Sequence, residues 1–201
     1  MGSSAATGRF AIYALGGAVS VAALSLLAPF EPVDTSTGYR DLPVQVQTVT
    51  DTLNVRKLPS LWLMVTIAAP LPVTSTFDLM MRPAGPTTFS NFDHLPVTIE
   101  RPPDFPEQAV IRTDDPGHLL PPHVVAPHLE PFFGGRAKEL LITPNGIRMV
   151  FLIGEADRVR YGVFRQAEFG DAVVEANMLT DSLDRLIALR TAIVDWLGKN
   201  R

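Results

Sequence analysis

The chain begins with a long uncharged stretch and continues with shorter runs of alternating and apolar residues. Residues 10–30 carry no charged side chain, while Arg9 and Glu31 flank the stretch. A helix of this length covers roughly 31 Å, about the thickness of the hydrocarbon layer of a bilayer. The pattern predicts a transmembrane helix over 10–30, preceded by an N-terminal tail over 1–9.

Two other interpretations of this stretch stay open. A cleaved signal peptide would also carry a basic residue before its apolar run. The run is longer than the usual core of about 7–15 residues, and Val21-Ala22-Ala23 is a poor cleavage site inside it. A buried core helix of this length would normally show a polar face. The retained span is therefore favoured.

Small side chains recur within the predicted span at intervals of four residues. Lipid tails provide no hydrophobic drive between helices, so small residues matter because they let two backbones approach closely. This pattern favours packing against other membrane helices over a simple anchor. The candidate helix-packing residues are Ala14, Gly16, Gly17, Ala18, Ser20, Ala22 and Ser25.

After the span, residues 31–43 are polar and rich in turn formers, which indicates a linker before an extramembrane domain over 44–201. Residues 44–50 alternate between apolar and polar types, as in a strand with one buried face. Residues 61–67 form a continuous apolar run bounded by prolines, typical of a strand buried on both faces.

Fourteen of the 18 prolines lie between Pro59 and Pro131. Proline removes a backbone donor and fixes φ, so this region is expected to hold short strands and extended loops. The expected strands are 76–81, 97–100 and 109–113. Asp115 before Pro116 is typical of a helix start, because the carboxylate can accept from free N–H groups there.

The last third predicts a hairpin and a long helix. Strands over 139–142 and 147–153 flank Asn145-Gly146, a common hairpin turn. Alternation over 159–164 indicates a further strand. An apolar stripe predicts an amphipathic helix over about 171–197 that packs on the sheet, so the fold class is α+β, an antiparallel sheet with a C-terminal helix on it. The stripe consists of Leu179, Leu183, Leu186, Ile187, Ile193, Val194 and Leu197.

Charge and composition limit the classes of partner and of binding site that the chain can have. Residues after 30 carry a net charge of about −5, which argues against a nucleic-acid partner and against a polybasic grip on anionic lipid. The chain has no cysteine, so it has no disulfide, thiolate metal site or cysteine nucleophile. Positive charges flanking the span are nearly balanced and favour an extracytoplasmic domain by a small margin.

Three histidines spaced five apart, His118, His123 and His128, are the most visible candidate for metal binding. Three imidazoles could bind Zn²⁺, but helical ligand pairs normally sit four apart on one face, and the prolines between them prevent one regular helix. His94 could join them only through folding. Surface or capping histidines are the favoured interpretation, with no metal or other cofactor expected.

Other motifs also favour structural roles. Asp114-Asp115 fits helix capping better than an acid–base pair, and Gly134-Gly135-Arg136 fits a helix terminus better than a phosphate-binding loop. Trp62 is expected in the core. No nucleophile elbow, phosphate-binding loop or dinucleotide motif is present in the sequence. A basic cluster, expected to be a solvated strand face, consists of Arg158, Arg160 and Arg165.

The segments FPEQAVIRTDDPGHLL, LLITPNGIRMVFLI and LTDSLDRLIALRTAIVDWL together resemble a pattern of uncharacterised bacterial membrane-anchored proteins. The outline of one span and one domain is similar to single-span accessory subunits of photosynthetic or respiratory complexes. That resemblance implies a non-catalytic subunit in the bacterial inner membrane, in contact with lipid and with integral membrane subunits through residues 10–30 and the proline-rich surface. The alternative is a membrane-anchored enzyme or metal-binding protein that uses the three histidines.

Overall fold

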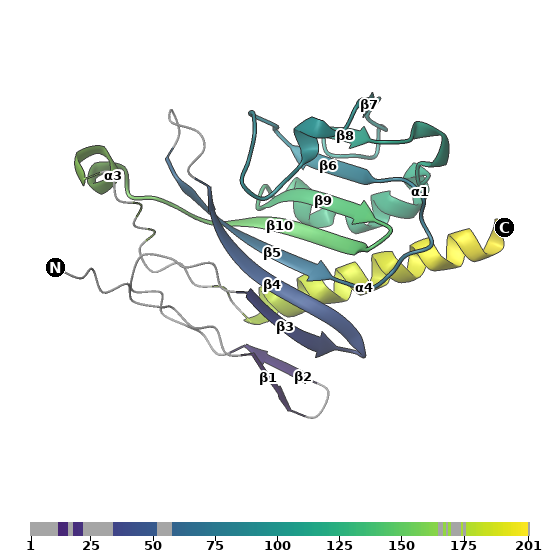
Figure 1. Ribbon diagram of the computed structural model, residues 1–201, viewed down its shortest axis with the longest axis horizontal. Coiled ribbons are helices and arrows are strands. Elements are labelled where there is room, and N and C mark those ends of the chain that lie inside the picture. Colours follow the sequence, from purple (N-terminus) through teal and green to yellow (C-terminus); the bar gives the residue numbers. More distant parts are fainter. Residues whose placement is uncertain are drawn as a thin grey trace.

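The computed structural model describes residues 12–15, 18–21, 34–51, 58–164, 167, 169, 174 and 176–200. In this part of the chain, eight antiparallel strands form one sheet in the order β3-β4-β5-β10-β9-β6-β8-β7 (Figure 1). The strands are β3 (Asp34–Tyr39), β4 (Leu42–Asp51), β5 (Ser60–Ile67), β6 (Phe77–Met81), β7 (Val97–Ile99), β8 (Ala109–Thr113), β9 (Ala137–Thr143) and β10 (Gly146–Glu155).

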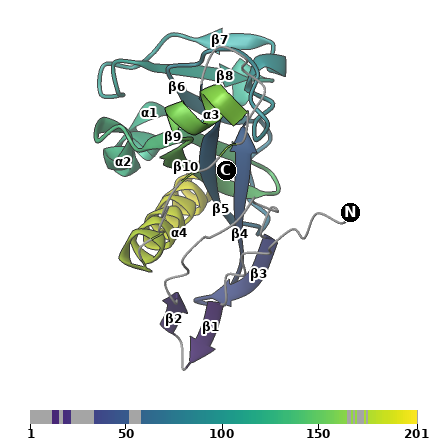
Figure 2. The ribbon, with the colours of Figure 1, turned by 90° about the vertical axis from the view of Figure 1, so that its left-hand side faces the viewer.

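Helices cover one face of this sheet, which we call the first face. Figure 2 shows α1, α2 and α4 on the same side of the strands. The α-helices are α1 (Pro122–Val125), α2 (Glu130–Phe133), α3 (Arg158–Phe164) and α4 (Ala176–Lys199). The short 3₁₀ helices are η1 (Phe92–His94), η2 (Pro116–His118) and η3 (Ala126–His128). The predicted α+β class, with a C-terminal helix packed on an antiparallel sheet, is therefore confirmed.

The apolar stripe of α4 forms one side of the main core. Leu179, Leu183, Leu186 and Ile193 are buried against the sheet, as the helical spacing predicted. Val194 is exposed, so its place in the predicted stripe is wrong. Polar contacts fix the same helix at the β3–β4 turn, where the Tyr39 hydroxyl donates to the Asp184 carboxylate at 2.8 Å.

Strand β5 is buried on both faces, as its unbroken apolar sequence predicted. Leu63 and Val65 belong to the main core beneath α4, whereas Trp62 and Met64 belong to a smaller cluster on the opposite face. The predicted strands in 44–50, 76–81, 97–100 and 109–113 are likewise present, with boundaries moved by one or two residues.

Residues 159–164, predicted as a strand, form helix α3 instead. Asp157 explains the difference, because its carboxylate accepts a hydrogen bond from the backbone N–H of Arg160 at 2.7 Å. Its carbonyl oxygen accepts from the N–H of Tyr161 at 2.9 Å. These bonds start a helix at a point where side-chain alternation alone favoured a strand.

The N-terminal region also differs from the expectation. Strand β1 (Ile12–Leu15) pairs with β2 (Ala18–Val21), although both lie inside the predicted span. The other residues of the span lie outside the described part of the chain. No helix among the described residues is long and apolar enough to cross a membrane. Strand β3 and the first two residues of β4 also lie inside the segment predicted as the linker 31–43.

The hairpin of β9 and β10 is present as predicted, but its two turn residues are Pro144 and Asn145, one position earlier than the predicted Asn145-Gly146, and Gly146 begins β10. Gly146 has φ of 152°, and a Cβ atom there would lie 2.2 Å from the carbonyl oxygen of Ile67 on β5. Only glycine fits this close approach, so this first residue of β10 also determines how the hairpin joins the neighbouring strand.

Gly146→Ala is expected to lower the free energy of unfolding by about 3 kcal/mol, because the added carbon overlaps backbone atoms that cannot move aside. Chemical denaturation measures the change. The control is Gly162→Ala in α3, where a Cβ meets open space and a gain of about 0.5–1 kcal/mol is expected. Equal stability of the two variants would contradict this account of the turn.

Candidate functional site

Three charged side chains lie together on the second face of the sheet, opposite α4. Asp78 on β6 and Glu139 on β9 are buried, with 2% and 0% of their surfaces exposed. Arg148 on β10 donates from Nη2 to Oε2 of Glu139 at 2.9 Å. Two carboxyl groups and one guanidinium group therefore share a largely dry environment.

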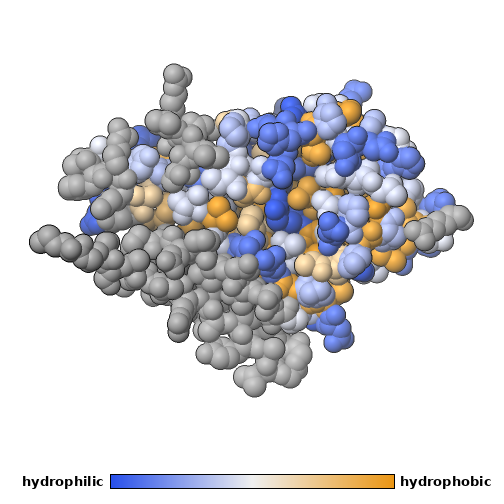
Figure 3. All heavy atoms as spheres, in the orientation of Figure 1, coloured by the Kyte–Doolittle hydropathy of each residue, from blue (hydrophilic) through white to orange (hydrophobic). Residues whose placement is uncertain are grey.

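Strand register explains why these residues meet. Arg148 and Asp78 both pair with Leu141, one from each side of β9. Glu139 lies two residues from Leu141 on the same strand, so it points to the same face and is the diagonal neighbour of both. The same transverse row continues from Asp78 to Arg112 on β8. Figure 3 shows the outer surface on this side of the sheet, where hydrophilic side chains form a band between hydrophobic patches, while Asp78 and Glu139 are buried beneath the surface.

Burial changes the proton affinity of both acids. Desolvation, followed by the charge of Glu139, raises the pKa of Asp78 to about 8, although Arg148 acts in the opposite direction. Desolvation also raises the pKa of Glu139, while Arg148 and a hydrogen bond from Ser90 lower it. Because Arg148 bonds Glu139 directly, Asp78 is the acid that holds a proton at neutral pH.

Hydrogen bonding within the group is incomplete. Oδ1 of Asp78, Oε1 of Glu139 and Nε of Arg148 have no hydrogen-bond partner among the described residues. Leaving such atoms unpaired in a dry environment costs free energy. The arrangement can store a proton and release it as the pH rises above neutrality.

A segment of residues 82–96, which we call the covering segment, lies over this face. The Phe89 ring of this segment packs against the Trp62 ring, with the two ring centroids 5.1 Å apart. Arg112 donates from Nη1 to the carbonyl oxygen of Asp93 at 3.0 Å, and its guanidinium lies 5.1 Å from the ring centroid of Phe92. The covering segment has no regular structure beyond η1, so its backbone carbonyl groups need other hydrogen-bond donors. Side chains of the sheet provide such donors.

The sequence did not single out Asp78, Glu139 or Arg148 as a site. Each is one charge inside an otherwise apolar strand, in FDLMM, AKELLIT and GIRMVFLIGE. A charge at a buried strand position needs a partner, so this signal was available. Their meeting depends on the pairing of β6 with β9, which are far apart in the chain.

The three candidate histidines lie on three separate short helices, η2, α1 and η3. Nδ1 of His118 lies 2.7 Å from Oδ2 of Asp115. Burial, and then the charge of Arg185, lowers the pKa of His128. Across the described residues, no group of three or more histidine, cysteine or acidic side chains is placed to hold a metal ion.

Asp115 caps η2 by accepting from the N–H of Gly117 at 2.9 Å, as expected. Asp114 instead accepts from the backbone N–H and the hydroxyl of Thr76, at 2.7 and 2.9 Å. Desolvation acts to raise the pKa of Asp114, but the hydrogen bonds from Thr76 and from nearby backbone N–H groups together lower it. These two acids therefore hold loops and helix ends in place.

The remaining candidates divide between described and undescribed parts of the chain. Gly134 ends α2, which confirms the predicted helix terminus, and Trp62 is buried as expected. Arg158 and Arg160 are exposed on a helix, not on a strand, and Arg165 lies outside the described residues. Among the helix-packing candidates, Ala14 falls in β1, and Ala18 and Ser20 fall in β2. The others, Gly16, Gly17, Ala22 and Ser25, lie outside the described residues.

Comparisons of the chain with protein families, with curated proteins and with solved structures found no match. The functional argument therefore depends on the sequence pattern and on the geometry of the domain.

The buried acids predict a pH dependence of stability. Between the ordinary pKa of 3.8 and the folded value of about 8, Asp78 holds a proton in the folded protein and loses it on unfolding. The free energy of unfolding should therefore fall as the pH rises from about 4 to about 8. Asp78→Asn should remove most of this slope and stabilise the protein at pH 8 by about 1–3 kcal/mol.

Denaturation curves measured at several pH values test this prediction. Asp93→Asn is the matched control, because Asp93 is exposed and its carboxylate lies outside the buried group. A variant Asp78→Asn that keeps the full pH slope would show that the buried acid is not its source.

Proposed function

We propose that the chain is a non-catalytic, single-span accessory subunit of a bacterial inner-membrane protein complex. In this proposal residues 10–30 lie in the bilayer beside helices of partner subunits, and the α+β domain lies at the membrane surface. The carrying observation is the uncharged run of 10–30, which ends four residues before strand β3.

The short strands β1 and β2 do not conflict with a helix in lipid. A two-stranded hairpin leaves backbone donors and acceptors on its outer edges, which water can satisfy and hydrocarbon cannot. A helix pairs these groups internally. Transfer of the uncharged segment from water to a bilayer therefore favours a helix, and the small residues give that helix a surface for close packing.

The position of β3 supports a role at the membrane surface. Three residues lie between Phe30 and Asp34, so the four intervening peptide steps would place the edge of the sheet within about 14 Å of the end of the span. β3 is an edge strand of the main sheet, and the β1–β2 hairpin lies beside it (Figure 1). Entry of residues 10–30 into the bilayer would uncover this edge, which could then accept a strand of a partner.

Two charges placed in the middle of the span should prevent membrane insertion. The double variant Val21→Arg, Leu24→Arg is expected to lose carbonate-resistant membrane association, because each arginine costs about 2.5–3.5 kcal/mol at a helix centre. The control Val21→Leu, Leu24→Ile keeps the apolar character and should stay in the membrane fraction. A wild-type chain found intact in the soluble fraction would overturn the proposal.

Packing with partner helices predicts a separate effect. Ala18→Ile with Ala22→Ile should leave the chain in the membrane but abolish its co-migration with other subunits on native gels in mild detergent. The bulk removes close backbone approach without reducing hydrophobicity. Leu26→Ile with Leu27→Ile is the matched control and should still co-migrate. A wild-type chain that always migrates alone would contradict the role as a subunit.

A further inference from the structure

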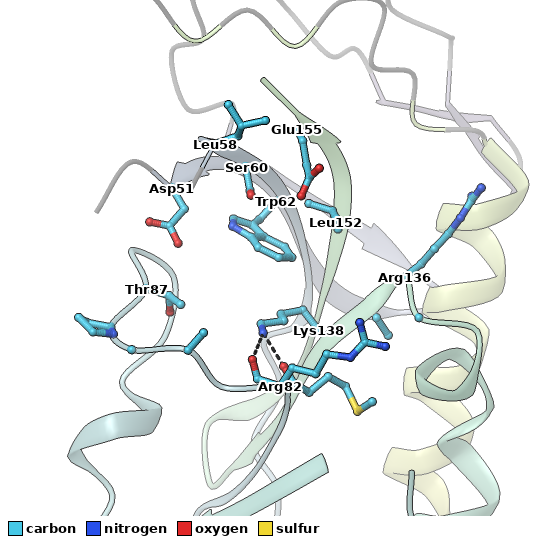
Figure 4. Close-up of a pocket in the computed structure, with 16 residues that line it drawn as sticks. Asp51, Leu58, Ser60, Trp62, Arg82, Thr87, Arg136, Lys138, Leu152 and Glu155 are labelled. Carbon is cyan, nitrogen blue, oxygen red and sulfur yellow. Dashed lines mark hydrogen bonds between the residues drawn. The ribbon is translucent and has the colours of Figure 1, made fainter. Parts of the chain in front are cut away.

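A cavity of about 300 Å³ opens on the second face, next to the covering segment. It lies where β4 and β10 end and where β5 and β9 begin (Figure 4). Apolar side chains, among them Trp62, Leu58 and Leu152, form part of its wall. Its volume is at the lower end of the range for small-molecule pockets.

Two buried polar atoms at this wall have no hydrogen-bond partner within the described part of the chain: Nε1 of Trp62 and Oγ1 of Thr87. The Trp62 side chain is deeply buried, since only 8% of the residue surface is exposed. Figure 4 shows its indole nitrogen on the side of the ring that faces Asp51 and Thr87. Each of these side chains has a single polar atom, so each is wholly unpaired.

Charged groups of both signs surround the cavity. Asp51 and Glu155 both pair with Ser60, one from each neighbouring strand, so the two carboxylates flank a hydroxyl on the same face. Arg82 and Arg136 also line the cavity. Lys138 donates from Nζ to the carbonyl oxygen of Arg82 at 2.9 Å, and also to that of Met81, and so fixes the start of the covering segment.

We infer that this cavity binds a small neutral ligand rich in hydroxyl groups, of the size of a monosaccharide. A hydroxyl group both donates and accepts. Ligand hydroxyls can therefore accept from Nε1 of Trp62, exchange a hydrogen bond with Thr87, and donate to the carboxylates of Asp51 and Glu155.

The charges at the rim favour this class over charged ligands. Side chains of both signs line the cavity, so an anion drawn to Arg82 or Arg136 would also meet the carboxylates of Asp51 and Glu155. A cation would meet the positive charges of Arg82 and Arg136 and would leave the indole N–H without an acceptor. A neutral polyol can pair with the unpartnered Trp62 and Thr87 and can also hydrogen-bond charged side chains of either sign, without bringing a net charge into the cavity.

Tryptophan fluorescence can test the inference on the full chain in detergent. The chain contains two tryptophans, so Trp196→Phe leaves Trp62 as the only reporter. Glucose, N-acetylglucosamine and inositol are the probes, and at least one is expected to give a saturable change. Inorganic phosphate and ethanolamine, tested alongside, represent the anionic and cationic classes. A saturable fluorescence change with phosphate or ethanolamine alone would overturn the inference. So would the absence of a saturable change with every probe, which is the result expected if the cavity holds only water.

Thr87→Val provides the matched test, because it keeps the shape and removes the hydroxyl. It should weaken binding of the active probe about fivefold to tenfold, the effect of one hydrogen bond. It should also leave the thermal midpoint unchanged or raised, since the hydroxyl has no partner to lose. Thr98→Val, the same change at an exposed position on β7, should alter neither property.

Outcomes that contradict the inference are equally specific. If Thr87→Val leaves the affinity for the active probe unchanged, the Thr87 hydroxyl does not contact the ligand. A lowered thermal midpoint with weakened binding would show that the hydroxyl supports the fold and not the ligand. The test does not require membrane insertion, so its failure would leave the proposed accessory role unaffected.

Discussion

Burial of the central strands from both sides is the constraint on which the rest of the structure depends. Strands β5, β10, β9 and β6 carry apolar side chains on both faces, so each face needs a cover. Helix α4 provides most of it on the first face through its apolar stripe. On the second face the cover is the segment between β6 and β7, which contains three prolines and little regular structure.

The covering segment has little regular structure, so its backbone groups need hydrogen-bond partners from other parts of the domain. Arg112 and Lys138 supply them from the sheet, and both thereby place cationic side chains against carbonyl oxygens. The same arrangement puts charge on a face that is otherwise apolar. The acid pair at Asp78 and Glu139 is a further consequence, because Ser90 of the covering segment bonds Glu139 and helps exclude water from it.

Local patterns in the sequence predicted most of the fold. The run LWLMVTI indicated a strand buried on both faces, Asn145-Gly146 indicated the hairpin turn, and helical spacing indicated α4. Local patterns misled where a single capping interaction decided the structure, as with Asp157 at the start of α3. The short alternation of residues 159–164 carried too little information to outweigh that cap.

The candidate site was less accessible from sequence than the fold. Asp78, Glu139 and Arg148 come from three strands, and their contact requires the non-consecutive pairing of β6 with β9. The local spacing of apolar and polar residues does not predict which distant strands pair. The visible motif, three evenly spaced histidines, lies in a proline-rich region where each histidine belongs to a different short helix.

The strand register relates the cavity to the start of β3, the strand that follows the proposed span. Strand β3 begins at Asp34, which pairs with Gln47, four residues before Asp51 at the cavity rim. At about 3.3 Å per residue, this interval along β4 is roughly 13 Å. The chain that leaves the proposed span therefore enters the sheet toward the cavity end of β4 and away from the β3–β4 turn. If residues 10–30 lie in the bilayer, the cavity lies on the membrane-proximal side of the domain, where hydroxyl-bearing headgroups and envelope sugars are concentrated.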